Sequence, residues 1–132
     1  MYEQQPVELG GAAEIEVLAK GPLAAALRIE RRLHKSKLVQ EVWLRRDSRT
    51  LEFRTTIDWK ERHKLLKVCF PTTLHANEAV HEIQFGHLRR PNHRSRPFDG
   101  DRYEVSAHRW TALAEENRGA AVLNDGKYGV NV

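Results

Sequence analysis

The chain has 132 residues, 40% of them hydrophobic and 30% charged, and its formal net charge is +4. This length and composition are typical of one globular domain with a buried core, which excludes wholesale disorder and a fibrous repeat. No apolar run approaches the roughly 18 residues of a membrane helix, and the N-terminal residues lack the hydrophobic region of an export signal. We therefore expect one domain over residues 1–132, with no membrane partner.

The first part of the chain alternates strand-like segments with turn signals. We expect strands at 14–18 and 23–33, separated by the turn residues Lys20-Gly21-Pro22. The second segment is ambiguous, because its alanines and arginines favour a helix whereas its alternation favours a strand. The polar residues 34–37 then predict a hairpin loop before a strand at 38–46.

The clearest periodicity lies at residues 51–59. Apolar or β-branched side chains alternate there with polar side chains. The apolar or β-branched ones are Leu51, Phe53, Thr55, Ile57 and Trp59. Such side chains are favoured on a pleated surface that packs on one face. The pattern predicts a half-buried strand.

The second part of the chain also carries strand-like runs. We expect strands at LLKVCF (65–70), VHEIQFGHL (80–88) and RYEV (102–105), then a hairpin of Trp110–Ala114 and Ala120–Leu123. About eight or nine short strands without a helical period predict an all-β fold, an antiparallel β-sandwich. The final YGVNV is typical of the start of another strand, so we expect exposed sheet edges through which the chain can self-associate.

Cys69 is the only cysteine, so an internal disulfide is excluded. It lies within the apolar run LLKVCF, where a small buried thiol is the usual role. We expect Cys69 to be buried and the protein to lie in the reducing cytoplasm.

The positive charge is concentrated in HLRRPNHRSRP, residues 87–97. A basic cluster of this kind can bind phosphates, which makes nucleic acid a partner to consider. No aromatic residues are interleaved with these arginines, so we expect a solvated loop or salt-bridge partners and no nucleic-acid partner.

Signatures of catalysis and metal binding are absent from the sequence. The aspartates fall at expected turns or outward strand positions, and no serine lies in a GxSxG context. The seven histidines have neither an HExxH motif nor cysteine companions. We assign no catalytic residue, metal ligand or cofactor to this chain.

The turn LNDGKYG, residues 123–129, is the most distinctive polar segment. Its glycines would present amide, carboxylate, ammonium and phenol groups together, from Asn124, Asp125, Lys127 and Tyr128. Such groups can hydrogen-bond sugar hydroxyls and offer an aromatic face. Taken alone, the residues favour a simpler reading, a tight turn with Tyr128 packed against the core.

Four segments in fixed order carry a resemblance to a known family: WKERHKLLKVCFP, EIQFGHLRRPNH, RYEVSAHRW and VLNDGKYG. They resemble the C-terminal β domain of the family 38 glycoside hydrolases, most closely the bacterial and cytosolic type of class II α-mannosidase. The match covers residues 57–132. The sequence departs from the family at 95–99, where an Asn-Thr-Ser-Trp-Asp string is more usual, and at Gly126, where cysteine is common.

The resemblance implies a fragment of a galactose-mutarotase-like supersandwich that packs against an N-terminal catalytic barrel. It also implies a retaining α-mannosidase whose aspartate nucleophile and zinc ion both lie in that barrel, outside this chain. The chain would then be an accessory domain, inactive alone, with residues near a mannoside substrate: Asn124, Asp125, Lys127 and Tyr128. The alternative is a stand-alone carbohydrate-binding or protein-interaction β-sandwich module.

Overall fold

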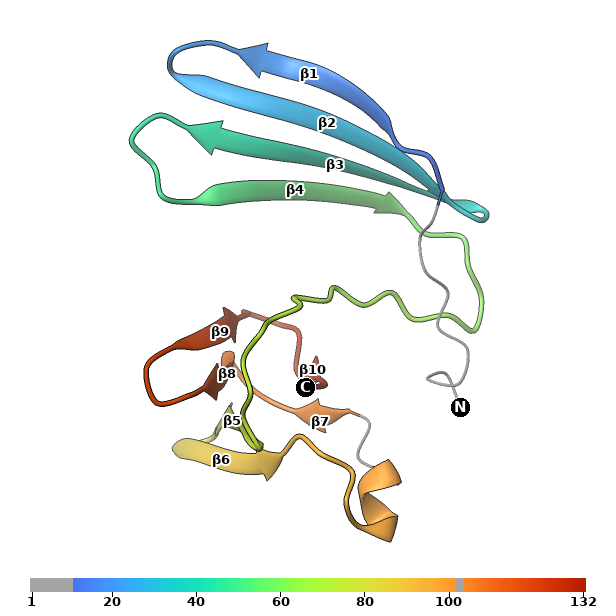
Figure 1. Ribbon diagram of the computed structural model, residues 1–132. Helices are drawn as coiled ribbons and strands as arrows, with labels where there is room; N and C mark the ends of the chain where they lie inside the picture. The colour runs from blue at the N-terminus through green and yellow to red at the C-terminus, as the bar shows by residue number, and fades with distance from the viewer. Residues whose placement is uncertain (1–10, 102–103) are drawn as a thin grey trace. The chain divides into compact units, whose positions relative to one another are not determined.

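The computed structural model describes residues 11–101 and 104–132, and the chain divides into two compact units, Met1–Leu66 and Lys67–Val132. Each unit is built from antiparallel strands (Figure 1). The all-β, antiparallel fold class predicted from the sequence is therefore confirmed.

The first unit is a four-stranded meander in the order β1-β2-β3-β4. Its strands are β1 (Glu14–Lys20), β2 (Ala24–Leu33), β3 (Ser36–Arg45) and β4 (Leu51–Asp58). All four agree with the predicted segments to within a few residues, and the predicted turn closes with Gly21 N donating to Ala24 O at 3.0 Å.

The pairing register gives this sheet two chemically opposite faces. One cross-strand row joins Val17, Leu27, Val42 and Phe53, whereas the next row, on the other face, joins Glu16, Arg28, Glu41 and Arg54. Because successive side chains of a strand point to opposite faces, the predicted alternation of β4 extends across all four strands. The result is one apolar face and one charged face.

The charged face is cross-linked by ion pairs and cation–π contacts. Arg54 Nε lies 2.8 Å from a Glu52 carboxylate oxygen, and the guanidinium groups of Arg45 and Arg54 lie 5.3 and 5.5 Å from the Trp43 ring. The Trp43 Nε1 group donates to Glu41 at 2.9 Å. These contacts order the charged side chains, but exposed pairs of this kind contribute little to stability.

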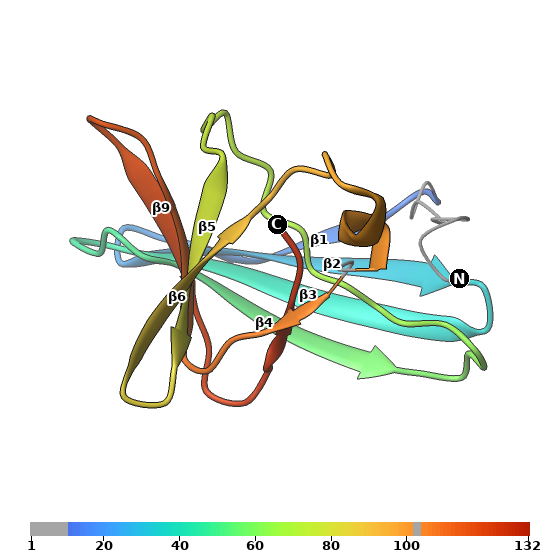
Figure 2. The same cartoon turned by 90° about the horizontal axis from the view of Figure 1, so that it is seen from below.

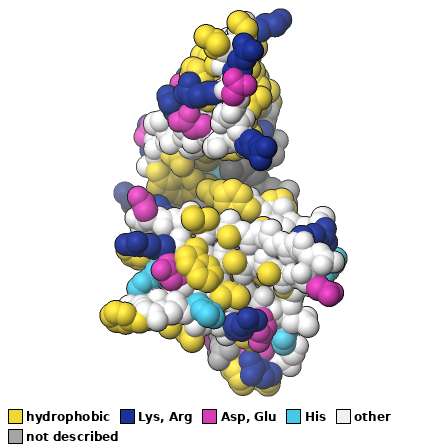
Figure 3. Space-filling view, turned by 90° about the vertical axis from the view of Figure 1, so that its left-hand side faces the viewer, with side chains coloured by type: hydrophobic (Ala, Val, Ile, Leu, Met, Phe, Trp, Pro, Cys, Tyr) yellow, Lys and Arg dark blue, Asp and Glu magenta, His cyan; other side chains and the backbone are white. Residues whose placement is uncertain are grey.

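The apolar face is much less buried than the sequence predicts. Seven of its large side chains retain between 38% and 65% of their surface: Ile15, Val17, Leu27, Leu44, Leu51, Phe53 and Ile57. Figure 3 shows hydrophobic side chains reaching the surface among the charged ones. The main contacts between elements of this unit are those between neighbouring strands. The half-buried strand expected at 51–59 thus has the right alternation and an exposed apolar side.

The second unit contains a four-stranded sheet in the order β6-β5-β8-β9 and a two-stranded one that pairs β10 with β7 (Figure 1). Figure 2 shows β5, β6 and β9 of the larger sheet from below. The strands are β5 (Glu78–Ile83), β6 (Gly86–Pro91), β7 (Val105–Ser106), β8 (Trp110–Ala114), β9 (Gly119–Leu123) and β10 (Gly129–Val130). A 3₁₀ helix, η2 (Pro97–Asp101), follows β6. The predicted hairpin of β8 and β9 is confirmed, and β10 begins within the YGVNV segment.

Three predictions for residues 65–88 are wrong. The run VHEIQFGHL, expected as one strand, is a hairpin whose turn lies between Ile83 and Gly86, which pair with each other. The run LLKVCF forms no strand, and Cys69 within it is exposed instead of buried. An apolar run becomes a strand only where a neighbouring strand completes its backbone hydrogen bonds. Of the predicted strand RYEV, residues 102 and 103 lie outside the described residues.

The loop between β2 and β3 is closed by a buried serine. Ser36 is 2% exposed, its hydroxyl donates to Glu61 Oε1 at 2.9 Å, and it accepts from Lys60 N at 2.9 Å. The same Glu61 oxygen accepts from Lys35 N at 2.8 Å. Partial burial opposes ionisation, yet these two donors lower the pKa of Glu61. Ser36 thereby joins the hairpin to the segment that follows β4.

A buried histidine occupies the centre of the second unit. His81 of β5 is 2% exposed, and its Nδ1 lies 3.1 Å from Thr111 Oγ1 of the paired strand β8. Burial and the positive charge of Arg90 lower the pKa of the imidazole. The folded chain therefore holds His81 neutral.

We predict that Ser36→Ala lowers the free energy of unfolding by about 1–3 kcal/mol, because it leaves Lys60 N and a Glu61 oxygen without their buried partner. Urea denaturation of the two chains measures the difference. Ser48→Ala is the matched control, since the Ser48 hydroxyl is exposed and bonds only within its own turn. Equal losses from both substitutions would contradict the role given to Ser36.

We predict that acid destabilises the chain in part through His81. The unfolded chain takes up a proton at the ordinary pKa of 6.5, whereas the folded chain resists protonation at that pH. Stability should be level above this pH and fall as the pH drops below it, because the unfolded state then binds more protons. Denaturation at several pH values measures the slope, which should be shallower in His81→Asn; an unchanged slope would count against a neutral buried imidazole.

Candidate functional site

The turn after β9 is held by the side chain of Asn124. Its Oδ1 accepts from Gly126 N at 3.1 Å and from Lys127 N at 2.9 Å. Its backbone N donates to Arg109 O at 2.7 Å, which joins the turn to the start of β8. An asparagine that accepts two backbone N–H groups forms the local turn that the sequence favours at this position. Asn124 therefore shapes the turn.

The other three predicted site residues reach the surface. Asp125 and Lys127 are exposed, and 59% of Tyr128 is exposed. The Tyr128 ring lies 5.8 Å from the ring of His108, and its carbonyl accepts from Ala107 N at 2.8 Å. Tyr128 thus packs on His108 and keeps a free face, whereas the sequence taken alone favours packing into the core. The turn presents a carboxylate, an ammonium group and an aromatic ring to solvent.

His108 is the neighbour that sequence reasoning misses. It precedes β8, and its backbone N donates to Glu82 O at 3.0 Å. Nothing in the spacing of the histidines signals this position, because Tyr128 lies 20 residues further along the chain. The pairing of β10 with β7, through Gly129 and Ser106, is what brings the two rings together.

The strand after the turn is fixed by an ion pair and a close glycine. Lys67 Nζ lies 3.3 Å from a Glu104 carboxylate oxygen and donates to Asn131 Oδ1 at 3.2 Å. A Cβ at Gly129 would clash with the other Glu104 oxygen, so any side chain there displaces this carboxylate. The glycine permits the close approach that holds β10 in place.

The basic segment serves largely to brace the second unit. Arg89 lies 4.0 Å from the Glu78 carboxylate, and Arg90 donates to Ser106 O at 3.1 Å. Arg96 binds Asp99 with its backbone N at 2.9 Å and with its guanidinium at 3.2 Å. The expectation of salt-bridge partners is confirmed for Arg89 and Arg96, whereas Arg90 binds a backbone carbonyl.

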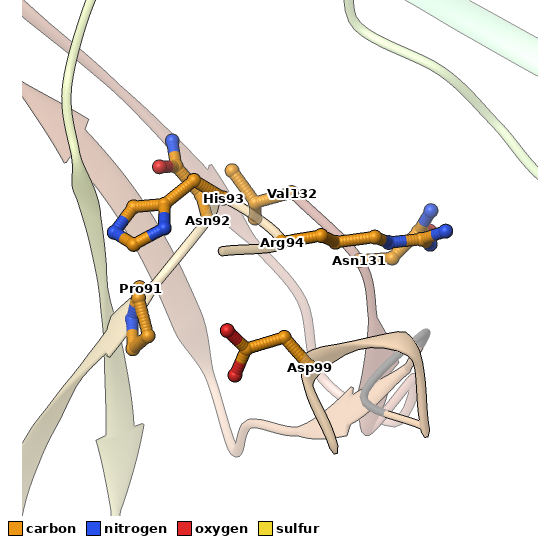
Figure 4. A pocket seen from close by; sticks show the side chains of 7 residues that line it. All are labelled: Pro91, Asn92, His93, Arg94, Asp99, Asn131 and Val132. Atoms are coloured by element: carbon orange, nitrogen blue, oxygen red, sulfur yellow. The ribbon is translucent and has the colours of Figure 1, made fainter. Parts of the chain in front are cut away.

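A shallow polar hollow adjoins this segment (Figure 4). Its volume is about 70 Å³, and it is lined by Pro91, Asn92, His93, Arg94, Asp99, Asn131 and Val132. Ligand pockets for small molecules have volumes of about 300–1,000 Å³. The hollow has room for a few water molecules and not for a sugar ring.

Among the residues that the structure describes, the carboxylates with shifted pKa values are all held in the ionised form. The guanidinium of Arg96 lowers the pKa of Asp99, that of Arg118 lowers the pKa of Glu115, and that of Arg54 lowers the pKa of Glu52. A general acid needs the opposite change, a raised pKa.

Among residues 11–101 and 104–132, no three histidine, cysteine or carboxylate side chains gather as metal ligands would. No helix of this described part is long and apolar enough to cross a bilayer.

Comparison with known proteins assigns the chain to a family. The model of the glycosyl hydrolases family 38 C-terminal domain matches residues 1–132, the whole length of the chain. The chain therefore belongs to this family of C-terminal domains.

Three curated relatives are α-mannosidases. The chain is 42% identical over 130 residues to alpha-mannosidase 2C1 of Homo sapiens and to that of Mus musculus, with 98% of the chain aligned in each case. It is 37% identical over 122 residues to alpha-mannosidase G of Dictyostelium discoideum, which aligns with 86% of the chain. The chain spans only 12%, 12% and 11% of the lengths of these relatives.

We predict that Asn124→Ala lowers the free energy of unfolding by about 1–2 kcal/mol, because two backbone N–H groups lose their acceptor. Thermal denaturation followed by circular dichroism measures this loss. Asp125→Ala, at the exposed neighbouring position, should leave stability unchanged. If the two substitutions had the same effect, Asn124 would not be the residue that holds the turn.

Proposed function

We propose that this chain acts as an accessory C-terminal domain of an α-mannosidase, which supports the active site and does not cleave a glycoside alone. The observation that carries the proposal is the match of the whole chain to the model of a C-terminal domain, while its alignment with the human relative covers only 12% of that protein. The remaining part of such an enzyme would then be the partner, including an N-terminal catalytic barrel that holds the zinc ion.

The chemistry of the described residues supports a role without catalysis. Retaining glycosidases need two carboxyl groups about 5 Å apart, one of which has a raised pKa. In this chain the carboxylates with shifted pKa values have arginine, lysine or backbone donors and are shifted downward. These side chains are engaged in holding strands and loops.

The exposed apolar face of the first unit supports the proposal that this domain packs against other parts of an enzyme. A sheet with one apolar face is stable when that face packs against a second layer about 10 Å away. The apolar face of β1–β4 is still substantially exposed. We propose that other parts of the α-mannosidase pack on this face and complete a β-sandwich.

The turn at residues 123–129 is the part of this domain that we propose to lie near a mannoside. Asp125, Lys127 and Tyr128 supply an acceptor, a donor and an aromatic face at the surface. Asn124 contributes by shaping the turn, since its Oδ1 already accepts two backbone N–H groups.

The cytoplasm is our proposed location, because Cys69 is an exposed free thiol. The edge strands β1, β4, β6 and β9 leave self-association open to the isolated chain.

The proposal is tested by grafting this chain into human alpha-mannosidase 2C1 in place of the segment that it matches. We expect the graft to hydrolyse an aryl α-mannoside, and the isolated chain to show no turnover with or without zinc. Asp125→Ala and Tyr128→Phe in the graft should each lower kcat/KM about five- to tenfold, as expected for one lost hydrogen bond to the substrate.

Asp47→Asn is the matched control, because Asp47 lies in a turn of the first unit with a φ of 60° that asparagine accepts. Its kcat/KM should equal that of the unsubstituted graft. An inactive graft, or turnover by the isolated chain that a chelator abolishes, would overturn the accessory role. Sugar binding by the isolated chain together with an inactive graft would favour the stand-alone carbohydrate-binding module.

A further inference from the structure

Phe85 at the tip of the β5–β6 hairpin combines two unfavourable features. Its exposed fraction is 109%, so the whole side chain is in water. Its φ is 63°, in the left-handed region that glycine and asparagine occupy most easily. The other non-glycine residues with positive φ are His34, Asp47 and His63. Phe85 is the bulky apolar exception among the described residues, and its ring gains no burial in return.

The hairpin that carries Phe85 is braced close to its tip. The Glu82 carboxylate accepts from Arg109 N at 2.8 Å, and the Glu82 carbonyl accepts from His108 N at 3.0 Å. His87, which pairs with Glu82 across the hairpin, places its ring 6.5 Å from that of Trp110. The tip is thus displayed by a fixed support, which lowers the entropy lost when it binds.

We propose that Phe85 is an anchor that inserts its ring into an apolar pocket on the remaining polypeptide of an α-mannosidase. An inserted aromatic ring buries about 150–250 Å² and is a typical centre of a binding interface. Local strain that brings no gain within its own unit is characteristic of functional contacts. The inference rests on the proposed function, because the partner is the part of the enzyme that this chain does not contain.

The isolated chain tests whether Phe85 serves its own unit. Phe85→Asn fits the left-handed backbone, so its melting temperature should equal or exceed that of the unsubstituted chain. His34→Asn is the matched control, because His34 occupies the equivalent turn of the β2–β3 hairpin with a φ of 57°. A lower melting temperature for Phe85→Asn would mean that the ring stabilises this unit, and would overturn the proposal.

The graft into human alpha-mannosidase 2C1 tests the partner. We expect Phe85→Asn to raise the rate of proteolytic cleavage of the graft about tenfold, as loss of a buried aromatic anchor does, and His34→Asn to leave it unchanged. If the graft is active and Phe85→Asn is as resistant as the parent, the anchor is wrong and the accessory role stands. If the unsubstituted graft is inactive, both the Phe85 anchor and the accessory role are wrong.

Analytical ultracentrifugation of the isolated chain tests whether the Phe85 ring binds a second copy of this chain instead of the rest of the enzyme. We expect Phe85→Asn and the unsubstituted chain to have the same sedimentation behaviour over a range of concentrations. Association of the unsubstituted chain that Phe85→Asn abolishes would make a second copy the partner of the ring. That result would overturn the assignment to the rest of the enzyme.

Discussion

The alternation of side chains across β1–β4, which a register shift between Val17 and Ala19 interrupts in β1, is the constraint on which the first unit depends. Registered pairing places Val17, Leu27, Val42 and Phe53 in one row and charged residues in the next. Burying one such apolar side chain fully is worth about 1.5–3 kcal/mol, whereas exposed ion pairs add little. The charged face adds little to the free energy of unfolding. The larger contribution has to come from covering the apolar face. This is the physical reason for the proposal that the sheet forms one layer of a two-layer sandwich.

The second unit is held together by a different kind of contact. His81 and Thr111 join β5 to β8 at the centre of the sheet, and Arg118 binds both the Glu115 carboxylate and the carbonyl of Thr73. Side chains that bond backbone groups fix loops where few apolar residues are buried. This arrangement explains how a short turn such as 123–129 can have a defined shape without a large core beneath it.

The sequence predicts the first unit better than the second, for a physical reason. In β1–β4 the periodicity of each strand and the turn residues between strands agree, so local signals determine the elements. In VHEIQFGHL the strand-like composition continues through Phe85, which is no usual turn residue, and the hairpin turn stays hidden. In LLKVCF the composition favours a strand, but pairing depends on distant residues. The same distinction applies to the site. The turn at Asn124 depends on local hydrogen bonds and is predictable from the sequence, whereas the contact of His108 with Tyr128 depends on tertiary structure.

The contacts that the chain leaves unmade are apolar. Within the described residues, every buried side-chain nitrogen or oxygen has a hydrogen-bond partner, and the carboxylates with shifted pKa values are stabilised as anions. The large apolar side chains of the first sheet and the ring of Phe85 are exposed. An active site has the reverse pattern, since it keeps polar groups poised for a substrate and buries its apolar walls. The balance of satisfied polar and exposed apolar groups supports the proposed accessory role, in which this domain packs against the rest of an α-mannosidase.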